Sequence, residues 1–445
     1  ISTCFIMNKS LVIAEKPSVA SDIAKALGGF KKVKDVYERD DMVITSAVGH
    51  LLKMVVPEKH DIKRGKWSLT KLPHLPPKFA LEPFEKTESR LKTIVRQIKR
   101  KDVDLLINAC DAAREGELIF RHIVEYTKSK HRIKRLWLQS MTPEAIRTGF
   151  NNLKSDNDLI PLSNAAKCRS EADWLVGINS TRAFTAFNSL DGGFYKTPVG
   201  RVKTPTLAMV VRREEEIVKF ISDPFFEINV NFTTNKGEYT GKYFDKNFKK
   251  DKGNQKFKES RIWDRDVALE IIKEISGQEA KAVDETKTLS QSPPSLFDLT
   301  SLQREANNRF GFSAKNTVGL AQALYDKHKL ITYPRTDSKF LPEDYVAIVK
   351  ETMSSLKSLP NYQKYCSEAL KLDFISDKHK VFNDKKVSDH FAIIPTGIAH
   401  KKLSEPELKL FDLITKRFLG VFFPPAKYLN TKRITSVKNY VFKTE

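Results

Sequence analysis

The fold is decided by the stretch Leu11-Val-Ile-Ala-Glu-Lys-Pro-Ser18, an apolar run followed by a charged pair and a proline. The apolar run predicts a buried strand over Leu11–Ala14, and Ser18–Leu27 has the spacing of a helix closed by Gly28-Gly29. Such alternation of strand and helix predicts an α/β domain with a mainly parallel sheet. Further elements of the same kind are expected at Met42–Ala47 (strand), Val103–Ala109 (strand) and Glu115–Tyr126 (helix).

The rest of the chain changes character several times, so we expect a multidomain protein with α/β, helical and β-rich parts. From Phe226 onward apolar and polar residues alternate, which predicts a sheet with one buried face, and Ser292-Pro-Pro294 marks a boundary. The lysine-rich stretch Lys246–Lys258 is expected to be a solvated hairpin or loop. The expected segments are 8–155 (α/β), 156–220 (helical), 221–290 (β-rich), 291–405 (helical) and 406–445 (a return to the β-rich part, truncated at the C-terminus).

The charge balance points to a polyanionic partner. The chain has 77 basic and 55 acidic residues, a net charge of +22, which favours nucleic acid over an anionic membrane, although a merely solvated lysine-rich surface is the alternative. No apolar run approaches the roughly 18 residues of a membrane span. The four cysteines lie far apart, which predicts neither a zinc site nor a disulfide framework but reduced thiols and a cytoplasmic location.

Carboxylates follow two of the expected parallel strands. Glu15 comes directly after the first strand, and Asp111, Glu115 and Glu117 follow the strand Val103–Ala109. Ligands of open α/β sheets bind beyond the carboxyl ends of strands, and converging carboxylates suit Mg²⁺. The alternative is that these are ordinary acids at helix N-termini, favoured by the helix dipole.

The segment Leu330-Ile-Thr-Tyr-Pro-Arg-Thr-Asp-Ser338 holds a candidate nucleophile. Because Pro334 disfavours a helical conformation for the residue before it, Tyr333 is expected in an extended segment or a turn. Arg335, two residues on, is placed to bind a phosphate on the same side. A tyrosine needs a cationic neighbourhood to act as a covalent nucleophile, and the alternative is a core tyrosine beside a turn. His390, before an apolar run, is a weaker candidate, since a lone histidine is more often structural.

Five motifs, in this order along the chain, resemble those of type IA DNA topoisomerases, and most of all the bacterial topoisomerase III branch. The match runs from about residue 9 to the end of the chain. The fourth motif is very specific, whereas the second identifies a Toprim domain, which primases and some nucleases share. The motifs are Leu11-Val-Ile-Ala-Glu-Lys-Pro-Ser18, Asp111-Ala-Ala-Arg-Glu-Gly-Glu117, Pro198-Val-Gly-Arg-Val-Lys-Thr-Pro-Thr206, Ile331-Thr-Tyr-Pro-Arg-Thr-Asp-Ser338 and His390-Phe-Ala-Ile-Ile-Pro-Thr396.

The resemblance implies a Toprim domain over 8–155 and a toroid built from the remaining segments. It implies an ATP-independent enzyme that acts as a monomer in the cytoplasm, at the nucleoid. The substrate that it implies is single-stranded or negatively supercoiled DNA. No GxxxxGK[ST] phosphate loop is present, which agrees with ATP independence. Protein partners are not implied.

The resemblance also implies a role for individual residues. Tyr333 would form a 5′-phosphotyrosyl bond, with Arg335 and His390 on the phosphate. Glu15 and Lys16 would act near the leaving 3′-oxygen. Mg²⁺ would be held by Glu15, Asp111 and Glu115. DNA contacts are expected from Arg114, Arg135, Arg169, Asp173, Arg201, Lys203 and Thr204.

Two positions depart from the family pattern. Ala113 stands where the second aspartate of Asp-x-Asp-x-Glu is usual, which removes one carboxylate and predicts a weaker or single-metal site. Lys203 stands where glutamine is usual and adds a cation. Two rival hypotheses remain: a Toprim nuclease or primase, which needs no Tyr-Pro-Arg motif, and a catalytically weakened Toprim protein that only binds single-stranded DNA.

Overall fold

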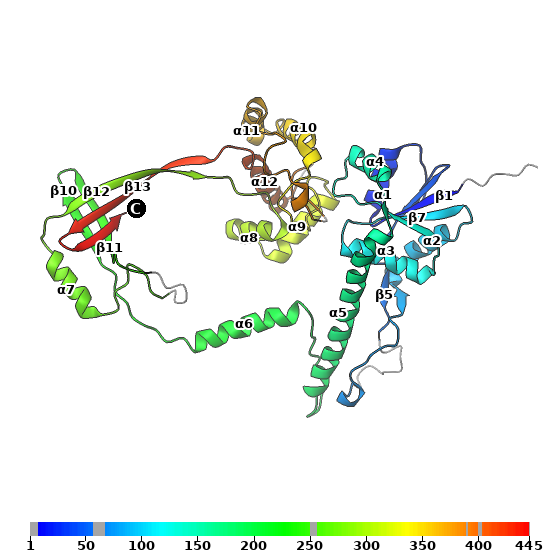
Figure 1. The fold of residues 1–445 in the computed structure, drawn as a ribbon, viewed down its shortest axis with the longest axis horizontal. Helices are drawn as coiled ribbons and strands as arrows, with labels where there is room; N and C mark the ends of the chain where they lie inside the picture. Colours follow the sequence, from blue (N-terminus) through cyan, green and yellow to red (C-terminus); the bar gives the residue numbers. More distant parts are fainter. Residues whose placement is uncertain (1–7, 57–66, 250–255, 389, 399–402, 445) are drawn as a thin grey trace, which may run out of the picture. The chain divides into compact units, whose positions relative to one another are not determined.

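The computed structural model describes residues 8–56, 67–249, 256–388, 390–398 and 403–444. The chain divides into two compact units (Figure 1). The first comprises the described residues up to Met209 together with Pro294–Phe422, and the second comprises Val210–Pro293 and the described residues from Phe423 onward. Each unit is considered by itself.

The first unit begins with a mixed seven-stranded sheet whose central strands are parallel. The central strands β1 and β7 are buried on both faces, as their nearly continuous apolar sequences require. The predicted α/β domain with a mainly parallel sheet is therefore confirmed. The strands are, in order across the sheet, β2 (Lys31–Val33), β3 (Val36–Glu38), β4 (Met42–Ser46), β1 (Lys9–Ala14), β7 (Val103–Ala109), β8 (Arg132–Arg135) and β9 (Lys154–Ser155).

Helices cover both faces of this sheet. Helices α1 (Pro17–Leu27) and α4 (Pro143–Asn151) pack on one face through Ile23 and Ile146. Helices α2 (Glu88–Ile98) and α3 (Arg114–Thr127) pack on the other, where Phe120 is fully buried. A small antiparallel pair, β5 (Leu52–Met54) and β6 (Leu81–Pro83), lies beside them. The long helix α5 (Ile160–Phe187) packs along α3.

The second part of the first unit is helical. Its helix ends are defined by capping: Asp298 forms a capping box at the start of α8, and Gly311 closes that helix with φ 68°. Helix α12 packs on α8 and α9 and buries Phe411 and Phe418. The helices are α8 (Leu299–Phe310), α9 (Ala314–Asp326), α10 (Val346–Leu356), α11 (Pro360–Lys371) and α12 (Glu405–Gly420). Helix α6 (Lys203–Val218) crosses the boundary between the units.

The second unit is a five-stranded antiparallel sheet with one helix, α7 (Arg265–Ile275), against it. Ile228 and Phe232 are buried with Phe442, so the predicted alternation over this stretch is confirmed. The strands are, across the sheet, β10 (Asn229–Thr234), β11 (Gly237–Phe244), β14 (Tyr440–Thr444), β13 (Ala426–Val437) and β12 (Lys281–Gln291). Of the expected loop Lys246–Lys258, residues 250–255 lie outside the described residues.

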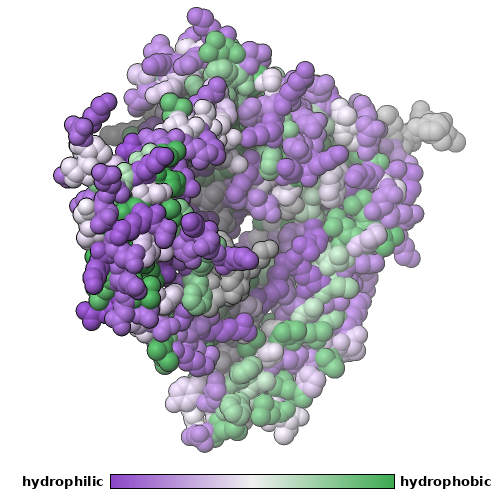
Figure 2. Space-filling view, turned by 60° about the vertical axis from the view of Figure 1, so that its left-hand side comes forward, coloured by the Kyte–Doolittle hydropathy of each residue, from purple (hydrophilic) through white to green (hydrophobic). Residues whose placement is uncertain are grey.

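The chain returns to the second unit later than expected. The return was placed at residue 406, but it begins at Phe423, because α12 buries its apolar face within the first unit. The surface in Figure 2 is largely hydrophilic, in keeping with a chain in which 30% of residues are charged. Among the described residues, no helix combines the length and apolarity needed to cross a membrane.

Candidate active site

The loops that follow β1 and β7 meet because these strands are parallel neighbours. Glu15 and Lys16 follow β1, and Pro17 starts α1 with a φ suited to the first helical position. Asp111 follows β7, and its backbone N–H donates to Glu15 Oε2 at 3.2 Å. The two carboxylates expected to converge therefore lie side by side at the carboxyl edge of the sheet.

Lys16 binds both carboxylates. Its Nζ lies 3.0 Å from Asp111 Oδ2 and 3.7 Å from Glu15 Oε1. Burial lowers the pKa of Lys16, but Asp111 and Glu15 raise it by more, so the net pKa is above its usual value. Burial and the nearby Asp111 charge raise the pKa of Glu15. Burial opposes ionisation of Asp111, yet hydrogen bonding from His390 and the charge of Lys16 lower its pKa to about 2.

Arg135 corrects one expectation. We expected it to contact DNA, but the residue is only 1% exposed. Its guanidinium donates to the backbone carbonyls of Asn108, Cys110 and Asp111 at 2.6–2.9 Å, and its Nε lies 3.7 Å from Glu117. Arg135 therefore holds the loop on which Asp111 stands. Glu117, also buried, accepts from Asn108 and Arg121 and is not a free ligand.

Tyr333 lies outside regular structure, as Pro334 predicts. Its segment is hydrogen-bonded to the segment that carries His390: Thr332 N–H donates to the Ile394 carbonyl at 2.9 Å, and the Thr336 hydroxyl donates to the His390 carbonyl at 2.8 Å. The apolar run after His390 forms isolated bridges rather than a strand. Two predicted site segments, more than 50 residues apart, are thus held together by one backbone–backbone and one side chain–backbone hydrogen bond.

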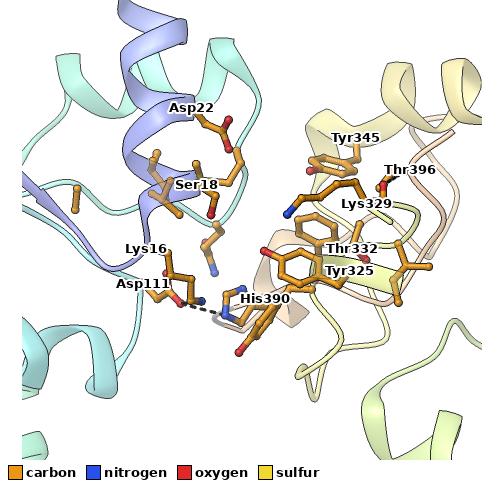
Figure 3. Close-up of a pocket in the computed structure, with 18 of the residues that line it drawn as sticks. Lys16, Ser18, Asp22, Asp111, Tyr325, Lys329, Thr332, Tyr345, His390 and Thr396 are labelled. Atoms are coloured by element: carbon orange, nitrogen blue, oxygen red, sulfur yellow. Dashed lines mark hydrogen bonds and ion pairs between the residues drawn. The ribbon is translucent and has the colours of Figure 1, made fainter. Parts of the chain in front are cut away.

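The first unit has two halves, the Toprim half (described residues of 8–155) and the tyrosine half (described residues of 294–422), and they meet around Tyr333. Its ring lies 4.3 Å from the His390 ring, and Lys16 Nζ lies 4.3 Å from the Tyr333 ring centroid. His390 Nε2 contacts Asp111 Oδ2 at 3.2 Å, the dashed contact in Figure 3. These groups line a pocket of about 380 Å³. The structure therefore brings together five predicted residues: Glu15, Lys16, Asp111, Tyr333 and His390.

Arg335 is placed differently. It is exposed, and among the described residues no hydrogen bond or ion pair of its guanidinium is found. A guanidinium in water beside the Tyr333 segment is available for an incoming anion. Its role on the phosphate remains a prediction.

Of the three predicted Mg²⁺ ligands, Glu15 and Asp111 lie together, and Glu115 does not join them. Within the described residues no group of three His, Cys, Asp or Glu side chains is placed to hold a metal ion. Glu115 is 61% exposed, and its Oε2 lies 3.5 Å from His50 Nε2. Glu15 and Asp111 do fit a cation, because their carboxylates stand side by side at the end of the sheet and carboxylate oxygens are ligands that Mg²⁺ prefers. The donor set suits a weak two-carboxylate site.

The expected DNA-binding residues, apart from Arg135, lie on or near the surface. Arg114 and Arg169 line a hollow of about 470 Å³ beside Ala113 and Trp137. Arg201 Nε forms an ion pair with Asp173 Oδ1 at 2.9 Å. Lys203 and Thr204 are exposed in the first turn of α6, where the Thr204 hydroxyl accepts the Gly200 N–H.

Sequence reasoning missed three residues that the structure brings to the pocket. Tyr325, in α9, packs edge-on against Tyr333 at 5.4 Å, and Asp22 and Lys329 line the pocket from opposite halves (Figure 3). Tyr325 and Asp22 fall within helical patterns, where the sequence gives no sign that separates them from ordinary packing or surface residues. Lys329 has φ 58°, a conformation that the sequence did not indicate.

Comparison with known proteins agrees with this geometry. Residues 158–445 match the sequence family described as DNA topoisomerase, and residues 10–141 match the Toprim domain, a metal-binding fold. The chain is 41% identical over 440 residues to DNA topoisomerase 3 of Bacillus subtilis (strain 168), covering 98% of this chain and 58% of that protein. It is 40% identical over 436 residues to DNA topoisomerase 3 of Shouchella clausii (strain KSM-K16), covering 97% and 57%.

A solved structure resembles the fold as well. Full-length topoisomerase I from Thermotoga maritima superposes with a TM-score of 0.59 at 22% identity, covering 98% of this chain and 64% of that one. The chain spans 58% of the length of the first of these curated relatives. On the family match over its larger part and the identity to these relatives, the chain belongs to the type IA DNA topoisomerases, in the branch that resembles topoisomerase 3, with an N-terminal Toprim domain.

Proposed function

We propose that this chain is the cleavage core of an ATP-independent type IA topoisomerase, which cuts one DNA strand, passes another through the break and reseals it. The observation that carries the proposal is the position of Tyr333, between His390 of its own half and Lys16 of the Toprim half. A phenolic nucleophile needs a cationic environment, and Lys16 supplies it at 4.3 Å.

The reaction is a transesterification. The Tyr333 oxygen attacks phosphorus and loses its proton, the bond from phosphorus to the 3′-oxygen breaks, and that oxygen takes up a proton to leave a 3′-hydroxyl. A 5′-phosphotyrosyl bond holds the other end. Because one phosphoester replaces another, resealing by the reverse steps needs no ATP.

Each side chain around Tyr333 has a role in this scheme. Lys16 carries a proton near the position of the leaving oxygen and has a raised pKa, so it stays charged until a stronger base forms beside it. Glu15 and Asp111 hold Lys16 in place. His390 and Arg335 meet the charge that grows on the phosphoryl oxygens. Mg²⁺, bound at Glu15 and Asp111, would supply further positive charge beside the DNA backbone.

The substrate is DNA with an unpaired strand, either single-stranded or negatively supercoiled. The net charge of +22 supports a phosphate-dominated interaction, and Arg114, Arg169, Arg201 and Lys203 offer cations on the same unit. We propose that the protein acts as a monomer, because the groups of the site come from one chain.

A second candidate is a Toprim protein that binds single-stranded DNA but cuts it poorly. Ala113 favours this alternative, because it leaves the Toprim motif one carboxylate short.

A single experiment separates the two candidates. Negatively supercoiled plasmid is incubated with the chain and Mg²⁺, then treated with denaturant followed by protease. The first candidate predicts relaxed circles before the quench, and after it nicked circles with a peptide on the 5′-end and an extendable 3′-hydroxyl. Tight binding of a single-stranded oligonucleotide with no nick and no adduct would favour the second. Nicks with free 5′-phosphates and no peptide would indicate a Toprim nuclease.

A further inference from the structure

The Toprim half carries a small receptor for a carboxylate at the start of α4. The hydroxyls of Ser140 and Thr142 lie there, just before Pro143 at the first helical position. Thr142 caps the helix by accepting the Ala145 N–H at 3.1 Å, and Ser140 Oγ accepts the Thr142 N–H at 3.4 Å. Both hydroxyls thus accept from backbone donors, and Ser140 Oγ also makes a long contact of 3.4 Å to Thr142 Oγ1. Their protons are available to an acceptor outside the turn.

The carboxylate that fills this receptor comes from the other half of the unit. Asp344 Oδ2 accepts from Ser140 Oγ at 2.8 Å and from Thr142 Oγ1 at 2.9 Å. A carboxylate can only accept, so both hydroxyls must donate to it. The positive end of the α4 dipole favours a negative charge at the same place. Asp344 therefore acts as a cap supplied from about 200 residues away in the chain.

Asp344 is directly connected to the nucleophile's surroundings. It lies in the 3-10 turn η5 (Glu343–Tyr345), and the next residue, Tyr345, lines the pocket around Tyr333 (Figure 3). The Tyr345 ring packs on Phe391 at 4.6 Å, beside His390. Docking of Asp344 on α4 thus fixes the part of the tyrosine half that holds His390 against Asp111.

The contact is also one that water can replace. Asp344 is exposed, and the neighbouring Gln139 makes one further polar bond across the halves, from Nε2 to the Val387 carbonyl at 2.9 Å. Because Asp344 is partly solvated, its bonds to Ser140 and Thr142 can define how the two halves meet while adding only a small free-energy cost to their separation.

We propose that Asp344 is a positioning residue that works as a releasable latch: it docks on Ser140, Thr142 and the N-terminus of α4, and so sets how often Tyr333 faces Lys16 and Asp111. The effect on DNA rests on the proposed function, in which a strand passes when the two halves separate. The docking itself is a property of the chain without DNA.

The test measures the separation of the halves directly. Dyes are placed on the exposed positions Lys25 (α1) and Lys357 (end of α10) through Lys25→Cys and Lys357→Cys, with Cys4→Ser and Cys168→Ser. Asp344→Ala should raise the ratio of open to closed molecules about tenfold, since a charge-assisted contact that is partly solvated is lost. Asp344→Asn keeps an acceptor oxygen but loses the charge, and should restore part of the closed population.

Two further variants separate a latch from general damage. Glu343→Gln removes an exposed charge one residue away and should leave the ratio of open to closed molecules unchanged. Ser140→Ala should open the halves by a few-fold, and Asp344→Ala should add less in that background than in the wild type, because both remove the same contact. Additive effects, or an equal effect of Glu343→Gln, would overturn the latch.

A measurement of covalent adduct formation with DNA distinguishes failure of the latch from failure of the proposed function. With a single-stranded oligonucleotide, Asp344→Ala should slow covalent adduct formation by the same factor by which the dyes show the closed fraction to fall, with nearly unchanged binding affinity. If no chain forms an adduct but the dyes separate in Asp344→Ala, the latch stands and the proposed function fails. If the wild type forms the adduct and Asp344→Ala changes neither dye separation nor rate, the latch fails alone.

Discussion

The Toprim half and the tyrosine half present their functional groups in opposite ways. On the Toprim half, Lys16 and Asp111 are bonded to each other and Arg135 is fully buried beneath them. On the tyrosine half, Arg335 is exposed, and the Tyr333 hydroxyl has no hydrogen bond to any described residue. The Toprim half is a fixed set of charges, whereas on the tyrosine half His390 is bound to Asp111 but the Arg335 guanidinium and the Tyr333 hydroxyl form no such bond to a described residue.

This difference suits a site that must form and separate repeatedly. Fixed charges stabilise a transition state best when they need no reorganisation at the moment of reaction, and buried bonds such as those of Arg135 provide that rigidity. The nucleophile and its phosphate-binding arginine, in contrast, must accept DNA each time the halves close. The comparison predicts loss of chemistry from changes on the tyrosine side and loss of stability from changes beneath the Toprim side.

The largest effect is expected from Tyr333→Phe. Only the nucleophilic oxygen is removed, so covalent adduct formation should be abolished while affinity for single-stranded DNA stays nearly intact. The measurement is adduct formation with a labelled oligonucleotide after denaturation, alongside a binding titration. An adduct that persists in this variant but disappears in Tyr325→Phe would assign the nucleophile to the other hydroxyl of the pocket.

Arg335→Ala should be the next most severe change. The guanidinium is uncommitted in the free protein and is expected to meet charge that grows in the transition state, so the cleavage rate should fall about 100-fold. Affinity should fall much less. Single-turnover cleavage and equilibrium binding, measured on the same oligonucleotide, decide this; equal losses in both would reduce Arg335 to a binding residue.

Arg135→Met tests the Toprim side of the comparison. The change leaves the Asn108, Cys110 and Asp111 carbonyls without their donor and Glu117 with less positive charge nearby, so unfolding of the first unit should become easier by about 3 kcal/mol. Arg132→Met is the matched control: it lies on the same strand, β8, but is 77% exposed and pairs with Asp104 at the surface. Its effect in a urea titration should stay within about 0.5 kcal/mol. Similar losses in the two variants would contradict the structural role of Arg135.

Much of this arrangement was predictable because it depends on local patterns. The apolar run Val103–Ala109 gave β7 with its bounds unchanged, and Pro334 excluded a helix at Tyr333. The prediction that Arg135 contacts DNA was wrong, although the sequence held a clue. In a strand, residues two apart share a face, so Arg135 points to the same side of β8 as the apolar Ile133. The pairing of Asp344 with Ser140 had no such clue, since neither residue has a special local pattern and the contact joins distant segments.

The smallest and most discriminating prediction concerns Ala113. With Glu15 and Asp111 as the paired carboxylates, we expect Mg²⁺ to be required for full relaxation but held weakly, so that activity rises over a broad, high Mg²⁺ range. Ala113→Asp adds a carboxylate beside Asp111 and should lower the Mg²⁺ midpoint on the order of fivefold, without a faster cleavage rate at saturation, since the nucleophile and its cations are unchanged.

Ala113→Asn is the matched control for this change. Ala113 is the N-cap of α3 and makes no side-chain cap bond, so a polar residue there can also act by capping the helix. Aspartate there can cap the helix as well as bind a metal, and asparagine caps equally well without the charge. A midpoint that moves in Ala113→Asp but not in Ala113→Asn reports metal binding. Equal movement in both would reflect a firmer helix start, and identical midpoints in all three proteins would place position 113 outside the reach of the metal. Direct Mg²⁺ titration by calorimetry, without DNA, checks the same order of affinities independently of activity.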